Sequence, residues 1–151
     1  MRITARRGLM ILPFLMACGW PVASCADPIS FSVQLRGAEE IPPVQTTGSG
    51  VADLTYDPAT RTVTWTVTCS GLSGTATMVH FHGPASRGEK GAVQLWLSKQ
   101  GSVVEGGRVA GQATLTPEQA DQFTAGRWYV NVHTQTNPGG EIRGQVVLPS
   151  R

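Results

Sequence analysis

The chain has 151 residues, which is enough for one domain with a hydrophobic core and too few for two ordinary domains. Charged residues make up only 15%, against about 25% in a typical soluble domain, and there are 18 glycines and 10 prolines. This composition excludes a coiled coil, a helical bundle and a basic nucleic-acid-binding protein. A hydrophobic content of 40% argues against a disordered chain.

The first 26 residues resemble a secretory signal peptide. Arg2, Arg6 and Arg7 precede an uncharged segment, residues 8–26, whose apolar centre covers residues 9–17. A basic start followed by a short apolar run is typical of a signal peptide, and this run is too short to span a membrane comfortably. Arg6 and Arg7 could also form a twin-arginine export signal.

More than one form of processing remains open at the end of this segment. Ser24-Cys25-Ala26 fits the small-x-small cleavage rule, which gives a signal peptide over 1–26 and a mature domain over 27–151. Val22-Ala23-Ser24-Cys25 also resembles a lipobox, in which Cys25 would carry the lipid; residues 15–18 resemble one less closely. We therefore expect a periplasmic or secreted protein that meets a membrane only if it is lipidated at Cys25.

Removal of the signal peptide changes the charge of the protein. The three arginines leave with it, so nine basic and ten acidic residues remain and the net charge becomes −1. A nearly neutral chain has no electrostatic basis for binding nucleic acid or an anionic membrane.

Cysteine is scarce in the mature chain. Cys18 and Cys25 belong to the signal segment, so simple cleavage leaves only Cys69, and one thiol cannot form an internal disulfide. Cys69 lies on the same side of its predicted strand as Trp65 and Val67, so we expect it to pack in the core as a small hydrophobic residue.

From Ile29 onward, apolar and polar residues alternate with a period of two, which is typical of strands. Asp57-Pro58-Ala59-Thr60 has the composition of a turn and would join two of these strands as a hairpin. The predicted strands cover residues 31–35, 50–56, 61–69, 76–82, 91–97, 107–115, 126–133 and 141–148.

Only the segment 116–123 has a helical pattern. Thr116 can cap its start, Pro117 suits the first helical position, and Gly126 follows its end. About eight short antiparallel strands and one short helix predict an all-β fold, a Greek-key antiparallel β-sandwich or a flattened barrel.

The three histidines of the chain all fall on the polar side of predicted strands. Val79 and Phe81 should face the core, so His80 and His82 should project from the opposite face. The same alternation in Arg127-Trp-Tyr-Val-Asn-Val-His133 turns His133 away from the core. The predicted inward residues of these strands and of the last strand are Val79, Phe81, Val130, Val132, Ile142 and Val146.

Two histidines in a His-x-His pattern can share one metal ion. Their Cα atoms lie about 7 Å apart on one face of a strand, and a histidine on a neighbouring strand would add a third nitrogen. Imidazole suits copper and zinc, whereas a site without carboxylates disfavours calcium and magnesium. We expect copper rather than zinc on His80, His82 and His133, with nearest ring nitrogens within about 4 Å of one another. Three unrelated surface histidines are the alternative.

Residues on the same faces could support this site. Met78 could offer a thioether to copper, and Glu141, Arg143 and Gln145 could hydrogen-bond to a ligating imidazole. Ordinary packing for Met78 and a surface ion pair for Glu141 and Arg143 are the alternatives. Trp96 falls on a polar side, where an exposed aromatic ring could meet a protein partner.

Three segments resemble the chordin-type domain family, CHRD, in its short exported bacterial form. The first is Leu35-Arg-Gly-Ala-Glu-Glu-Ile-Pro-Pro43, followed by Gly48-Ser-Gly-Val-Ala52. The second is Val79-His-Phe-His-Gly-Pro84, and the third runs from Gly126-Arg-Trp-Tyr-Val-Asn-Val-His-Thr134 to Gln145. The resemblance covers residues 29–148 and implies a single extracellular-type domain, over 27–151, of no fixed activity.

The histidine pattern is also similar to the copper ligands of copper/zinc superoxide dismutase. That resemblance would place copper on His80, His82 and His133, but the chain has no further histidine for the zinc site and no disulfide pair. Three hypotheses therefore remain: an exported copper-binding protein, a protein-interaction module without metal, and a copper-dependent, dismutase-like oxidoreductase. An analogy of fold is weak support for the third.

Overall fold

The structure, a computed structural model, describes residues 26–150. Residues 1–25 lie outside the described residues, and with them almost all of the predicted signal peptide, including Cys18 and Cys25. No helix in the described part is long and apolar enough to cross a membrane.

Eight strands form one antiparallel sheet in the order β5-β4-β7-β8-β1-β2-β3-β6. The strands are β1 (Ile29–Arg36), β2 (Ser49–Asp57), β3 (Thr62–Ser70), β4 (Ala76–Gly83), β5 (Ala92–Trp96), β6 (Arg108–Thr114), β7 (Tyr129–Thr134) and β8 (Ile142–Gln145). The predicted hairpin joins β2 to β3, and the two 3-10 helices at Gly37–Glu39 and Glu105–Gly107 were not predicted.

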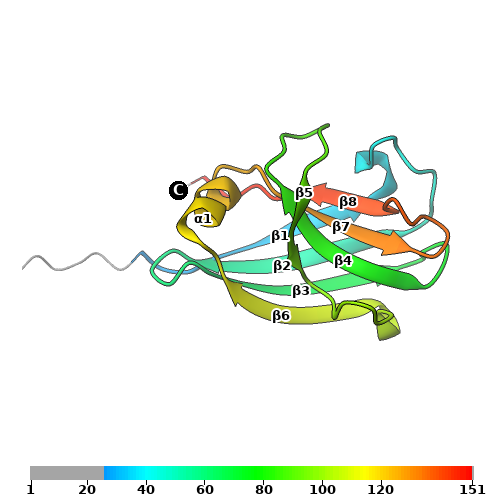
Figure 1. The fold of residues 1–151 in the computed structure, drawn as a ribbon, viewed down its shortest axis with the longest axis horizontal. Coiled ribbons are helices and arrows are strands. Elements are labelled where there is room, and N and C mark those ends of the chain that lie inside the picture. Colours follow the sequence, from blue (N-terminus) through cyan, green and yellow to red (C-terminus); the bar gives the residue numbers. More distant parts are fainter. Residues whose placement is uncertain (1–25, 151) are drawn as a thin grey trace, which may run out of the picture.

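The sheet curls so that its two halves face each other across the core (Figure 1). Trp65 on β3 packs edge-on against Phe81 on β4, and its indole N–H donates to the carbonyl of Leu97 at 3.2 Å. The chain crosses between the halves from β3 to β4, from β5 to β6 and, through the helix, from β6 to β7. The all-β prediction is confirmed, and the two layers of the predicted sandwich are the halves of one continuous sheet.

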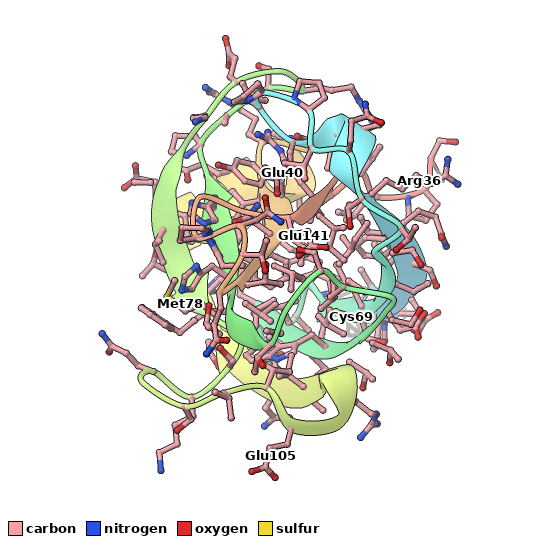
Figure 2. All side chains as sticks on the ribbon, turned by 90° about the vertical axis from the view of Figure 1, so that its right-hand side faces the viewer. Arg36, Glu40, Cys69, Met78, Glu105 and Glu141 are labelled. Carbon is pink, nitrogen blue, oxygen red and sulfur yellow. The ribbon has the colours of Figure 1, made fainter. Side chains whose placement is uncertain are left out.

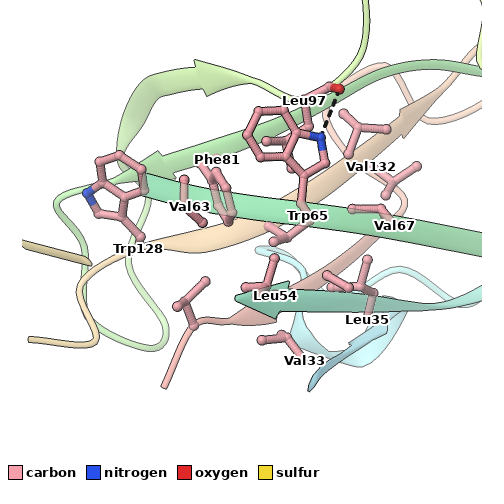
Figure 3. Close-up of a cluster of buried hydrophobic side chains, with 14 of the residues drawn as sticks. Val33, Leu35, Leu54, Val63, Trp65, Val67, Phe81, Leu97, Trp128 and Val132 are labelled. Atoms are coloured by element: carbon pink, nitrogen blue, oxygen red, sulfur yellow. Dashed lines mark hydrogen bonds between the residues drawn. The ribbon is translucent and has the colours of Figure 1, made fainter. Parts of the chain in front are cut away.

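The core lies between these halves, and Figure 3 shows part of it, around Trp65, Phe81 and Trp128. The six residues predicted to face inward are all fully buried: Val79, Phe81, Val130, Val132, Ile142 and Val146. Cys69 is half-buried and packs against the core, and its burial raises the pKa of the thiol to about 11. The alternation of apolar residues therefore assigned the faces of β4, β7 and β8 correctly.

The short helix α1 (Pro117–Thr124) closes one end of the curled sheet (Figure 1). Thr116 and Gln119 form a capping box at its start, and Pro117 occupies the first turn as predicted. Phe123 is fully buried and its ring contacts the ring of Phe81, with centroids 5.8 Å apart. This packing ties the helix to the strand that carries two of the histidines.

Candidate metal site

The three histidines come from two neighbouring strands. His80 and His82 lie on β4, and His133 lies on β7, which pairs with β4 in antiparallel register. In this register Met78 is opposite His133 and Asn131 is opposite His80. Residues opposite each other in a sheet project from the same face, so the three imidazoles share the face that points away from the core.

That face is not a solvent-exposed surface. His80 is only 3% exposed and His133 only 8%, and every residue of β7 is buried. Two loops cover the face, one between β1 and β2 and one between β4 and β5. The first is anchored by a hydrogen bond from Asn131 to Glu40, and the second by the hydrogen bond from Arg143 to the carbonyl of Glu89. A polar face can be buried in this way because the loops supply hydrogen-bonding partners to it.

Backbone carbonyl groups fix the orientation of two imidazoles. His82 Nδ1 lies 3.0 Å from the carbonyl oxygen of Gly91, and His133 Nδ1 lies 2.9 Å from that of Pro138. A carbonyl oxygen can only accept a hydrogen bond, so both Nδ1 atoms carry the proton and both Nε2 atoms are unprotonated. The Nε2 of His82 has no hydrogen-bonding partner, whereas that of His133 faces Nδ1 of His80. This is the arrangement by which proteins orient histidine ligands of metal ions.

Nitrogens of the three rings converge. His133 Nε2 lies 3.3 Å from His80 Nδ1, and one nitrogen from each of the three rings lies within 4.8 Å of the other two. This spread is slightly wider than the about 4 Å expected from the sequence. The Nε2 atoms of His80 and His82 are buried and have no hydrogen-bonding partner. A buried nitrogen without a partner is costly, and coordination of a metal ion would satisfy both of these atoms.

All three imidazoles are held in their neutral form. Burial, with smaller repulsion from His133 and His82, lowers the pKa of His80 to about 4. Burial also lowers the pKa of His82 and of His133, although the hydrogen bonds to Gly91 and Pro138 oppose the shift. Neutral imidazole is the form that binds metal, so the site is ready for an ion at neutral pH.

Aromatic rings flank the cluster on two sides. The ring of Trp96 lies against His80, with centroids 4.1 Å apart and planes nearly perpendicular. Tyr129 stacks in parallel on His82 at 5.0 Å, and the guanidinium of Arg143 lies 3.4 Å above the centre of the Tyr129 ring. Arg143, Tyr129 and His82 therefore form a three-layer stack beside the site.

The residues expected to support the histidines behave differently from one another. Met78 is half-buried beside His133 in the β4–β7 ladder. Arg143 acts on His82 through the ring of Tyr129 and not through a hydrogen bond to an imidazole. Gln145 donates to the carbonyls of Ala85 and Gly126, again without reaching an imidazole.

Glu141 is the clearest departure from the expectation. It is fully buried, and its two oxygens accept hydrogen bonds from Thr46, Ser73 and Thr134 at 2.6 to 2.8 Å. Burial alone would raise its pKa, but these hydrogen bonds outweigh burial and lower the pKa to about 2. Glu141 therefore joins loops to β7 and neither pairs with Arg143 nor supports a histidine. The sequence could not show this because two of its partners, Thr46 and Ser73, lie 95 and 68 residues away along the chain.

Trp96 is half-buried against His80, whereas the sequence suggested an exposed ring.

Sequence reasoning missed Glu40. This residue is 7% exposed, accepts a hydrogen bond from Asn131, and lies near Arg143. Burial, opposed by the charge of Arg143, raises its pKa to about 7. The position of Glu40 in a Pro-rich loop gave no signal that it would fold over β7.

Comparison with known proteins identifies the family. The family model of the CHRD domain matches residues 31–146, so the chain belongs to the CHRD domain family. No curated protein and no solved structure matches the chain.

Proposed function

We propose that this CHRD-domain chain is an exported copper-binding protein that holds one ion on His80, His82 and His133. The sequence supports export through its basic and apolar N-terminal segment. Copper binding in the periplasm or outside the cell is the function that suits a small, nearly neutral domain with one buried cluster of imidazoles.

One observation carries the proposal: two backbone carbonyls hold the imidazoles of His82 and His133 so that their Nε2 atoms are unprotonated and turned toward the cluster. The carbonyls belong to Gly91 and Pro138, at 3.0 and 2.9 Å. Surface histidines would instead present either nitrogen to water. In this buried cluster of three rings, the Nε2 atoms of His80 and His82 have no hydrogen-bonding partner. Coordination to a metal ion would satisfy their lone pairs.

The ligand types favour copper over other ions. The cluster contains three imidazoles and no carboxylate among the described residues, which is unsuited to calcium or magnesium. Among divalent ions, copper binds a given set of nitrogen ligands more tightly than zinc does.

The test is copper binding by the purified protein at pH 7.5. Copper should raise the thermal midpoint, because a ligand that binds only the native state stabilises it by about 2.7 kcal/mol at a hundredfold excess over Kd. It should also quench the fluorescence of Trp96, whose ring lies against His80. A Trp96→Phe variant, which keeps the histidines, should still be stabilised by copper but should lose most of the quenching.

His82→Ala is the decisive variant, because it removes one nitrogen and leaves the others in place. It should lose most of the copper-dependent stabilisation. Cys69→Ser is the matched control, because Cys69 packs against the core in another part of the sheet, and it should respond as the wild type does. Equal responses of the wild type and His82→Ala would contradict the metal site and favour a protein-interaction module.

A further inference from the structure

We infer that this site selects copper(I) over divalent copper and zinc, and that Arg143 is the residue that sets the preference. The inference rests on the proposed copper site and adds the oxidation state of its ion.

The ligand set brings no negative charge. Every group that converges on the site is a neutral imidazole, and within residues 26–150 no carboxylate or thiolate joins the cluster. The complex of the ion with the three imidazoles therefore keeps the full positive charge of the ion. The desolvation free energy of burying an ion grows with the square of its charge. It is therefore about four times as large for a divalent ion as for a monovalent ion of the same size.

The site is buried enough for this difference to matter. His80 and His133 are nearly inaccessible, and the Nε2 atom of His82 is buried as well.

A fixed cation lies next to the ligands. The guanidinium of Arg143 is 3.4 Å from the centre of the Tyr129 ring, and that ring is 5.0 Å from the ring of His82. The stack holds the positive charge on one side of the site, and the hydrogen bond from Arg143 to the carbonyl of Glu89 keeps it there. The positive charge of Arg143, one ring beyond His82, repels a divalent ion at the site more strongly than a monovalent one.

The other nearby charges do not cancel that of Arg143. Glu40 is the buried acid on this face, and with a pKa of about 7 it is only partly ionised at neutral pH. Glu39 is paired with Arg87, so these two contribute little net charge. Lys90 adds a positive charge near Glu40.

The coordination number that each ion prefers also favours copper(I). Copper(II) favours square-planar or tetragonal sites, and zinc in a site with three protein ligands takes water as a fourth ligand. Copper(I) is stable with fewer ligands and needs no anion. Here the rings of Trp96 and Tyr129 border the imidazoles of His80 and His82, so apolar carbon occupies two sides of the cluster.

The test measures three affinities of the full protein by competition with chelators. Copper(I) is measured anaerobically with bathocuproine disulfonate, and copper(II) and zinc are measured with chelators of known affinity. Arg143→Met keeps much of the apolar stem and removes the charge. It should tighten both divalent ions about tenfold relative to copper(I), as expected for one charge at roughly 10 Å in an effective dielectric of about 20.

Glu40→Gln is a second variant, and it should change the affinity for divalent ions relative to copper(I) in the opposite direction. The amide can still accept the hydrogen bond from Asn131, so the loop keeps its contact while the negative charge disappears. At pH 8.5, where Glu40 is ionised, this variant should weaken the divalent ions relative to copper(I). It also decides the question if Arg143→Met does not fold.

Preferential, histidine-dependent binding of copper(I), with the two variants shifting the preference in opposite directions, would support the inference. The inference would be overturned if zinc or copper(II) bound, in a histidine-dependent way, at least as tightly as copper(I). It would also be overturned if the preference for copper(I) were unchanged in the variants that fold. Either result would leave the proposed metal site itself uncontradicted. Loss of histidine dependence for all three ions would overturn the site as well.

Discussion

Replacement of Glu141 by glutamine should strongly destabilise the fold. The carboxylate is fully buried, and all its hydrogen bonds come from neutral donors, among them the hydroxyls of Thr46 and Thr134. In Figure 2 it lies near the centre of the view, whereas Glu105 projects from the edge. Glutamine has nearly the same shape, so the substitution removes the charge and one acceptor without opening a cavity.

The magnitude follows from the pKa of Glu141. Its value falls from 4.5 to about 2 in the folded protein, and each unit is worth about 1.4 kcal/mol, so ionised Glu141 contributes roughly 3 kcal/mol. The folded state binds fewer protons than the unfolded state between these two values. The contribution is therefore complete above about pH 4.5 and is lost as the pH falls toward about 2.

The assay is urea unfolding of wild type and Glu141→Gln between pH 2.5 and pH 7. The difference in unfolding free energy should approach 3 kcal/mol at pH 7 and shrink steadily below pH 4.5. Glu105→Gln is the matched control, because Glu105 is exposed, and it should change stability by less than about 0.5 kcal/mol at any pH. A difference for Glu141→Gln that stays constant with pH would refute the assignment of this energy to the ionised carboxylate.

Three further predictions follow from the core and the site. Phe81→Ala should cost roughly 3–5 kcal/mol in chemical unfolding, because it empties a fully buried position, and a loss below 1 kcal/mol would contradict the packing of β4. In chelator-treated protein, the unfolding free energy of wild type relative to His80→Phe should be highest above about pH 6.5 and should fall as the pH approaches 4, because only the unfolded state gains the proton; a pH-independent difference would contradict the lowered pKa. Gly140→Ala should destabilise by more than about 1 kcal/mol in thermal unfolding, since φ is 123° and the new Cβ would lie 2.5 Å from Asn131 Nδ2; an unchanged midpoint would show that the loop can move away.

The sequence predicted most of the fold from local signals. Alternation placed Phe81 and Val130 in the core, and the pattern around Thr116 and Pro117 predicted the helix to within one residue. These signals are short-range, since strand faces depend on a period of two and a helix start depends on its first turn. The match of the CHRD family model to residues 31–146 agrees with the motifs read from the sequence.

The three histidines were also found from the sequence, because the alternation put them on one face of two strands. What the alternation could not show is that this face is buried, since burial depends on loops that return from distant parts of the chain. The contact of Glu40 with Asn131 spans 91 residues, and that of Glu141 with Thr46 spans 95.

The sequence by itself therefore determined the strands, the core side chains and the identity of the candidate ligands. The tertiary structure decided the environment of those ligands: which nitrogen of His82 and His133 is unprotonated, which rings flank the site, and where the charge of Arg143 lies. The physical reason is the separation along the chain of the groups that interact. Side-chain direction is set by the local backbone, whereas desolvation and hydrogen bonding to loops depend on segments that meet only when the sheet curls closed.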